Sequence, residues 1–252
     1  MSLTMREFSP ATIDAISFHN KAVKVIQKKA GYRFAIDAIL LSDFMKVKAD
    51  DKNIIDIGTG SGIIALLLAK CFLHIKITGI ELQKGLFELA KESVRLNRLE
   101  AQVHIENVAI KDIKKRFKAE GFDAVVTNPP YRRFKSGRIN PTEEKAIARH
   151  EIKTNLEEII KISSYLLKAK GSLFLIHLPE RLAELIYQLK RCNIEPKRMR
   201  FVYSREGEDA AFVLMEGAKA GREGLKIERP LYIYDKSGEY TDEMKRIYGK
   251  KK

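Results

Sequence analysis

Three glycines at alternate positions follow an acidic residue in the segment Asp56-Ile57-Gly58-Thr59-Gly60-Ser61-Gly62. Glycine lets a chain turn sharply and lets backbone amides approach a bound ligand closely. The spacing differs from the dinucleotide-binding G-x-G-x-x-G pattern, and no Gly-Lys-Ser/Thr follows as it does in a phosphate-binding loop. The segment therefore predicts a binding turn for a nucleoside-type ligand, formed by Asp56, Gly58, Thr59, Gly60, Ser61 and Gly62.

A second acid, Glu81, closes the next apolar run, Ile75–Ile80. A carboxylate at the end of a second parallel strand can accept hydrogen bonds from both ribose hydroxyls of a nucleoside. A tight structural turn and a solvated glutamate are the alternative. The acid before the glycines and the acid after the second run together favour the binding site.

The tetrad Asn128-Pro129-Pro130-Tyr131 follows the fourth apolar run, Phe122–Thr127. An exocyclic amine is a poor nucleophile because its lone pair is delocalised. The Asn128 side-chain oxygen and the Pro129 carbonyl can accept both amine hydrogens and so orient that lone pair. The two prolines stiffen the turn, and Tyr131 offers a flat face to a planar substrate. We expect all four residues to be catalytic, although Asn-Pro can also simply end a strand.

Positive charge is in excess, with 47 Lys and Arg against 33 Asp and Glu and a net charge of +14. Such a balance is consistent with a polyanionic partner. Arg132, Arg133, Lys135 and Arg138 follow the tetrad directly, where a nucleic acid backbone would approach, so we expect them to bind RNA. A solvated loop is the alternative. Two further basic clusters lie within 190–200 and 111–118, and the latter is more typical of a solvated helix face.

Apolar runs alternate with helical patterns along residues 51–252, which predicts a mostly parallel α/β sheet. We expect strands over 53–57, 75–80, 103–105, 122–127, 172–178, 200–203 and 210–215. Helices are expected over 63–71, 83–97 and 154–167, with Gly171 as the stop for the last, and another is expected to begin at Pro179. The expected fold is a Rossmann-like α/β domain with a seven-stranded, mostly parallel sheet and helices on both faces.

Residues 1–50 precede this alternation and are expected to form an extension that covers the cofactor cleft. Val23–Gln27 alternates as a small strand does, and Ile36–Met45 has a helical pattern. The remaining residues, 51–252, would form the main domain.

Several function classes are disfavoured. No stretch approaches the roughly 20 apolar residues of a membrane helix, and nothing suggests export. Two cysteines are too few for a disulfide framework, and the five histidines lack metal-ligand spacing. We therefore expect a cytoplasmic protein without a metal or a membrane partner, most simply a monomer.

The D-x-G-x-G-x-G pattern with an acid after the second strand resembles class I S-adenosylmethionine-dependent methyltransferases. The resemblance implies that S-adenosylmethionine is the cofactor. Glu81 would hold its ribose, the backbone at 58–62 would pack against its methionine part, and Asn128 would border it. Such enzymes often carry an acid near the end of strand three that contacts the adenine. Ala109 stands in that place here, so a backbone amide is expected to make this contact.

Longer segments resemble the valine tRNA adenine-N6-methyltransferase family. The first is Gly31–Leu41, with Ala35 in place of the family's frequent serine. The second is the tetrad, followed by Gly137, Asn140 and residues 148–151. The third comprises residues 230–235, 238–241 and 247–248. The similarity runs from Val23 to Tyr248. It implies methyl transfer to the N6 amine of an anticodon-loop adenosine, with tRNA as the partner.

Other substrates share the tetrad. A protein glutamine-N5 methyltransferase that acts on release factors, and an N6-adenine or N2-guanine methyltransferase that acts on rRNA, remain as alternatives. A DNA methyltransferase is disfavoured because no target-recognition domain is visible. A tRNA-binding protein without activity is a non-enzymatic alternative. An N6 proton is easily lost to water, so His150 is expected to be structural or to contact RNA rather than to act as a base.

Overall fold

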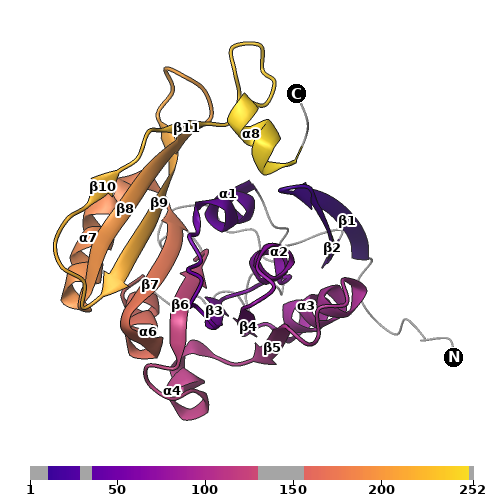
Figure 1. Ribbon diagram of the computed structural model, residues 1–252, viewed down its shortest axis with the longest axis vertical. Coiled ribbons are helices and arrows are strands. Elements are labelled where there is room, and N and C mark those ends of the chain that lie inside the picture. The colour runs from indigo at the N-terminus through magenta and orange to yellow at the C-terminus, as the bar shows by residue number, and fades with distance from the viewer. Residues whose placement is uncertain (1–10, 29–35, 130–155, 250–252) are drawn as a thin grey trace, which may run out of the picture.

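A computed structural model describes residues 11–28, 36–129 and 156–249, and its centre is a twisted β-sheet (Figure 1). The sheet order is β10-β8-β9-β7-β6-β3-β4-β5, with β11 also paired to β8. The strands are β3 (Asn53–Ile57), β4 (Lys76–Glu81), β5 (Val103–Asn107), β6 (Phe122–Thr127), β7 (Leu167–His177), β8 (Ile194–Tyr203), β9 (Ala210–Lys219), β10 (Lys226–Ile227) and β11 (Leu231–Tyr232).

The Rossmann-like α/β fold is confirmed, and the seven expected strands correspond to β3 through β9. Only β9 runs antiparallel to its neighbours within the sheet. The sheet has nine strands rather than seven because β10 and β11 both pair with the edge of β8. Each of these two strands has only two residues, which is too short for an alternating pattern to be recognised in the sequence.

Helices cover both faces of the sheet. One face carries α1 (Ile36–Phe44), α2 (Ile63–Cys71) and α3 (Lys84–Leu96), and the other carries α4 (Ile113–Arg116), α6 (Leu156–Leu166) and α7 (Leu182–Arg191). The short helices η1 (Ile110–Asp112) and η2 (Pro179–Arg181) precede α4 and α7, and α8 (Asp242–Ile247) lies near the end of the chain.

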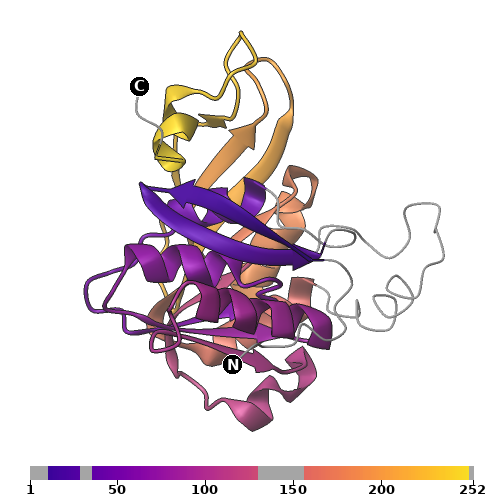
Figure 2. The same cartoon turned by 90° about the vertical axis from the view of Figure 1, so that its right-hand side faces the viewer.

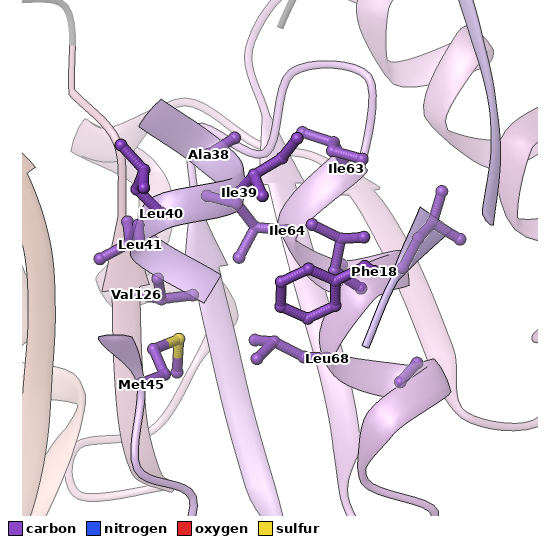
Figure 3. Packing of buried hydrophobic residues seen from close by; sticks show 14 of the residues in the cluster. Phe18, Ala38, Ile39, Leu40, Leu41, Met45, Ile63, Ile64, Leu68 and Val126 are labelled. Carbon is purple, nitrogen blue, oxygen red and sulfur yellow. The ribbon is translucent and has the colours of Figure 1, made fainter. Parts of the chain in front are cut away.

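Side chains that alternate along the strands divide the core into two layers. Ile54 and Val126 face the layer of α1 and α2, whereas Ile55 and Val125 face the layer of α6 and α7. Figure 3 shows side chains of α1 and α2 packed together with Val126 and Phe18. Helix α2 is buried over almost its whole surface, as its continuous apolar sequence predicts.

The extension before residue 50 contains an antiparallel hairpin of β1 (Ala11–Phe18) and β2 (Lys21–Lys28), followed by α1. Phe18, Val23 and Val25 belong to the same buried cluster as α1 and α2. Figure 2 shows the hairpin lying across α2 and α3. The expected strand and helix are therefore present, and β1 was not expected. The division at residue 50 and the covering of a cleft remain predictions.

The outer edge of β2 is covered by a side chain of α3 and by that of Asn97, which follows the helix, rather than by another strand. The Lys24 N–H donates to Asn97 Oδ1 at 3.0 Å, and the Ile26 N–H donates to Ser93 Oγ at 2.9 Å. These bonds satisfy backbone groups that would otherwise be open for pairing. The hairpin is thus fixed against the domain at one edge.

The expected helix stop at Gly171 is wrong. Helix α6 ends at Leu166, and β7 begins at once with Leu167, which pairs with Phe122. Gly171 lies inside β7, where the register shifts between the Phe122 and Ala124 pairs. A Cβ on Gly171 would stand 2.9 Å from the carbonyl oxygens of Asp123 and Lys168. The glycine is needed for this close backbone approach and not for ending the helix.

Other features of the described residues bear on the expected function classes. No helix there is long and apolar enough to span a membrane. Within the same residues, no three His, Cys, Asp or Glu side chains gather as they would around a metal ion. Cys71 and Cys192 are free thiols, each half-buried.

Candidate functional site

The register of the parallel strands brings the predicted site residues to one edge of the sheet. Ile57 at the end of β3 pairs with Ile80 of β4 on one side and with Thr127 of β6 on the other. Glu81 in turn pairs with Asn107 at the end of β5. The glycine loop, Glu81 and the tetrad therefore start side by side at the carboxyl edge, where open α/β sheets bind ligands.

The glycine loop depends on left-handed backbone conformations. Gly58, Gly60 and Gly62 have φ values of 73°, 58° and 83°, which side chains disfavour. The N–H groups of Gly58 and Thr59 donate to the Ile80 carbonyl at 2.9 and 3.0 Å. The loop is therefore anchored to β4 as it turns from β3 into α2.

Glu81 is directed into the glycine loop. Its Oε2 accepts a hydrogen bond from the Gly60 N–H at 2.9 Å, and its Oε1 accepts one from the Gln83 N–H at 2.8 Å. The residue is 7% exposed. The carboxylate is thus held by backbone donors at the edge where a ribose is expected.

Asp56 is fully buried beneath the same loop. Its Oδ2 accepts a hydrogen bond from Thr59 Oγ1 at 2.6 Å. Burial raises the pKa of Asp56 to about 7, the Thr59 hydrogen bond lowers it, and the nearby Glu81 charge adds to the rise. Within the described residues, neither Asp56 Oδ1 nor Ser61 Oγ has a hydrogen-bond partner. A buried acceptor of this kind suits a ligand with a positively charged donor.

The end of β5 supplies the place expected for a cofactor adenine. Ala109 is half-buried in extended conformation just before η1, and no hydrogen bond from its N–H occurs within the described part of the chain. Asn107 was not singled out from the sequence. Its side-chain amide donates to the carbonyls of Glu81 and Leu82 at 2.7 and 2.8 Å. In the sequence, only its position at the end of a strand could have indicated that Asn107 lies beside Glu81.

Two of the four tetrad residues are described. Asn128 is half-buried and Pro129 is buried, directly after β6. Thr127 Oγ1 donates to the Ile57 carbonyl at 3.0 Å, which fixes the end of β6 against β3 immediately before the glycine loop. Pro130, Tyr131, Arg132, Arg133, Lys135, Arg138 and His150 lie outside the described residues.

Much of the positive charge in the cluster at 190–200 is engaged in ion pairs. Arg198 pairs with Glu216 and Glu228, and Arg200 pairs with Glu243. Lys190 and Arg191 also pair with carboxylates. Arg198 and Arg200 are therefore engaged inside the fold and offer little free charge to a polyanion, whereas Lys190 and Arg191 remain about half exposed.

A buried histidine at the same edge was not predicted from the sequence. His177 ends β7, beside the turn that leads to Arg181 and Glu184. Its spacing fits no metal site, so the sequence pattern carried no signal for it. Only the position at a strand end could have indicated it.

Comparisons with known proteins indicate the family of the chain. The family model described as the methyltransferase small domain matches residues 35–185. A tRNA1(Val) (adenine(37)-N6)-methyltransferase of Porphyromonas gingivalis is 29% identical over 244 residues, which cover 93% of each chain. The enzyme of the same name from Dyadobacter fermentans is 27% identical over 225 residues, 88% of this chain and 90% of that one.

Solved structures share the fold. A structure described as a predicted O-methyltransferase from Agrobacterium tumefaciens aligns with a TM-score of 0.67 at 23% identity, over 84% of this chain and 95% of that chain. A geranyl diphosphate C-methyltransferase from Streptomyces coelicolor, solved with S-adenosyl-L-homocysteine, aligns with a TM-score of 0.54 at 13% identity, over 72% and 76% of the two chains.

Proposed function

Because the chain belongs to the methyltransferase small domain family, we propose that it transfers a methyl group from S-adenosylmethionine to the N6 amine of an adenosine in tRNA. The observation that carries this proposal is the pairing of Ile57 with Thr127. Because these two residues end β3 and β6, the glycine loop and Asn128 begin next to each other at the ends of neighbouring strands. A ligand in the loop and a substrate amine at Asn128 would therefore share one site.

The residues of the loop fit this cofactor. S-adenosylmethionine supplies, when bound, an electrophilic methyl group on a sulfonium. Glu81 would accept hydrogen bonds from the ribose hydroxyls, and the backbone of 58–62 would hold the methionine part. Asp56 Oδ1, which has no hydrogen-bond partner among the residues that the structure describes, provides a buried acceptor for a cationic group. The Ala109 N–H is the proposed contact for the adenine ring.

Asn128 and Pro129 would orient the substrate. The Asn128 side-chain oxygen and the Pro129 carbonyl accept the two hydrogens of the N6 amine, which directs the nitrogen lone pair away from the ring plane. Tyr131 would stack on the base, as proposed from the sequence. The surplus proton passes to water, so no side-chain base is required.

Relatives and charge support tRNA as the substrate. Relatives that align over nearly the whole chain are named for adenine 37 of a valine tRNA, and we propose the same target here. Segments 29–35 and 130–155, which adjoin Lys28 and Pro129, hold 9 of the 47 Lys and Arg but only 3 of the 33 Asp and Glu. We propose that Arg132, Arg133, Lys135 and Arg138 contact the RNA backbone. A tRNA substrate would place the enzyme in the cytoplasm.

The end of the N-terminal hairpin reaches the start of α3. Lys28 Nζ lies 3.7 Å from where a Cβ on Gly85 would stand, so the end of β2 meets the first turn of α3. This turn follows Glu81 closely in the sequence. We therefore propose that the hairpin helps to enclose the cofactor.

The role of Asn128 can be tested by separating binding from turnover. Asn128→Ala is expected to lower methyl transfer to total tRNA at least a hundredfold, because a poor nucleophile loses its orientation. The cofactor Kd, measured by calorimetry, should change less than threefold. Asn53→Ala, at the opposite end of β3, is the control and should retain activity. Turnover of the Asn128 variant at the rate of this control would refute the assignment.

A further inference from the structure

Asn107 ends β5 at the carboxyl edge of the sheet, beside the residue proposed to hold the ribose of the cofactor. Asn107 pairs with Glu81, and this is the last residue pair between β4 and β5. The Glu81 carbonyl accepts a backbone hydrogen bond from the Val108 N–H at 3.2 Å. Leu82 follows this last pair, where the chain turns towards α3. The position of the Glu81 side chain therefore depends on what holds this turn.

The side-chain amide of Asn107 holds the turn beyond the last strand pair. Its Nδ2 donates to the Glu81 carbonyl at 2.7 Å and to the Leu82 carbonyl at 2.8 Å. A primary amide has two N–H groups, so one is available for each carbonyl. Because a carbonyl oxygen only accepts, this pair of partners also fixes which end of the amide faces the turn. Asn107 thus fastens two successive peptide groups to the end of β5.

The Glu81 carboxylate lies over the same turn. Its Oε1 accepts a hydrogen bond from the Gln83 N–H at 2.8 Å, and its Oε2 accepts one from the Gly60 N–H at 2.9 Å. The bond to Gln83 spans the Leu82 peptide that Asn107 holds. A shift of this peptide would move the Gln83 N–H and, with it, the carboxylate. Glu81 is buried whereas Asn107 is exposed, so Asn107 supports the carboxylate from outside the site.

We propose that Asn107 is a positioning residue that holds the turn after β4 and thereby fixes the Glu81 carboxylate for the ribose of the cofactor. This inference rests on the proposed function, in which Glu81 accepts hydrogen bonds from the ribose hydroxyls. Asn107 acts through the backbone of Glu81 and Leu82 and does not bind the ribose itself. A carboxylate that is already fixed loses less freedom on binding than a mobile one, so the expected effect is on affinity.

Asn107→Leu removes the amide donor and keeps a side chain of similar size. We expect the Kd for S-adenosylmethionine, measured by calorimetry, to rise at least fivefold, because the turn is no longer held. The kcat for tRNA methylation at saturating cofactor should stay within threefold. Gln102→Leu is the matched control, since the Gln102 amide donates to the Phe72 carbonyl at the other end of β5, and its Kd should stay within twofold. A Kd for Asn107→Leu within twofold of the wild type would overturn the inference.

A double-mutant cycle tests whether the effect passes through Glu81. Glu81→Ala removes the carboxylate, so adding Asn107→Leu to it should raise the Kd less than twofold, because no carboxylate remains to be positioned. An equal fivefold rise in both backgrounds would refute the positioning role. If Glu81→Ala alone binds as tightly as the wild type, the proposed ribose contact fails, and the exchange measurement below then decides whether Asn107 holds the turn.

A second measurement needs no cofactor. In the ligand-free protein, the Gln83 N–H should exchange with deuterium at least fivefold faster in Asn107→Leu than in the wild type, because its bond to Glu81 depends on the held turn. Exchange in Gln102→Leu should stay within twofold of the wild type. Unchanged exchange in Asn107→Leu, or an equal increase in the control, would overturn the inference. If the wild type binds no S-adenosylmethionine but exchange behaves as expected, the proposed cofactor fails and the hold of Asn107 on Glu81 stands.

Discussion

At the scale of single residues, Asp56 lies under the glycine loop with one oxygen bound to Thr59 and the other without a partner in the described residues. Burial raises the pKa of Asp56 to about 7, so a sizeable fraction is protonated at neutral pH. A cationic ligand favours the ionised form. Binding of the cofactor should therefore release a proton from this residue.

The affinity for S-adenosylmethionine is expected to depend on pH through Asp56. The Kd should be about tenfold weaker at pH 6 than at pH 8, because below its pKa the carboxyl must first lose a proton. Calorimetry in buffers of different ionisation enthalpy would measure the affinity and the released proton. Asp56→Asn should bind more weakly and without this dependence. A pH-independent Kd in the wild-type protein would contradict the assignment.

The same pKa predicts how the stability of the ligand-free protein depends on pH. In the unfolded chain Asp56 ionises near its ordinary value of 3.8, whereas in the folded protein it stays protonated to about 7. The unfolded state therefore gains stability relative to the folded state as the pH rises between these values. As the pH rises from 5 to 7, the contribution of Asp56 should lower the Tm of the wild type, whereas the Tm of Asp56→Asn should lack this contribution.

Residue types and their spacing are enough to indicate much of the site. That the glycines, Glu81 and Asn128 lie at one edge could be predicted, because each follows or ends an apolar run and runs that form parallel strands end at the same edge. His177 and Asn107 could not be predicted in this way. Their place at the same edge of the sheet depends on which strands are neighbours, and strand order is not written in the local sequence.

At the scale of elements, β7 shows how pairing between distant segments overrides a local signal. Gly171 resembles a helix stop, but Leu167 already pairs with Phe122. The strand holds extra residues at the register shift, with Lys170 at a φ of 64°. The sequence predicted β6 with correct bounds because its apolar run is bounded by Gly121 and the Asn-Pro turn. The sequence pattern placed the start of β7 too late, at residue 172. The earlier residues of the strand belong to the register shift, which depends on contacts with Asp123 of β6.

Gly171→Ala is expected to destabilise the protein by about 1–3 kcal/mol, because the added Cβ meets two backbone oxygens that cannot move aside. Denaturant unfolding monitored by circular dichroism would measure this change. Gly121→Ala is the matched control, since its Cβ would make an ordinary contact of 3.5 Å with the Lys118 carbonyl oxygen. Equal stabilities for the two variants would show that β7 does not need a glycine at this position.

At the scale of the whole molecule, Arg198 joins parts of the chain that are far apart in sequence. Its guanidinium donates to Glu216 on β9, to Glu228 after β10 and to the Phe44 carbonyl at the end of α1, and it lies over the Phe44 ring. The N-terminal and C-terminal parts meet elsewhere too, where the His19 N–H donates to the Ile247 carbonyl at 2.9 Å. Composition counts these charges but cannot show which are used inside the fold.

Arg198→Met is expected to cost on the order of 3 kcal/mol of unfolding free energy, because it leaves the largely buried Glu216 carboxylate without its partner and leaves Glu228 with only the exposed Lys46. Lys115→Met is the control, since its ion pair with Asp112 is exposed to solvent and should contribute little to stability. Chemical denaturation of both variants tests this difference. If the Arg198 variant were as stable as the control, the residue would not join these elements.

The most direct test of the central proposal is nucleoside analysis of a valine tRNA transcript after incubation with the enzyme and labelled S-adenosylmethionine. A transcript with guanosine at position 37, total rRNA and a release factor serve as parallel substrates. We predict N6-methyladenosine in the unaltered transcript and no label in the other three. Label in the release factor or in rRNA, with none in the tRNA, would contradict the account of which substrate this site receives.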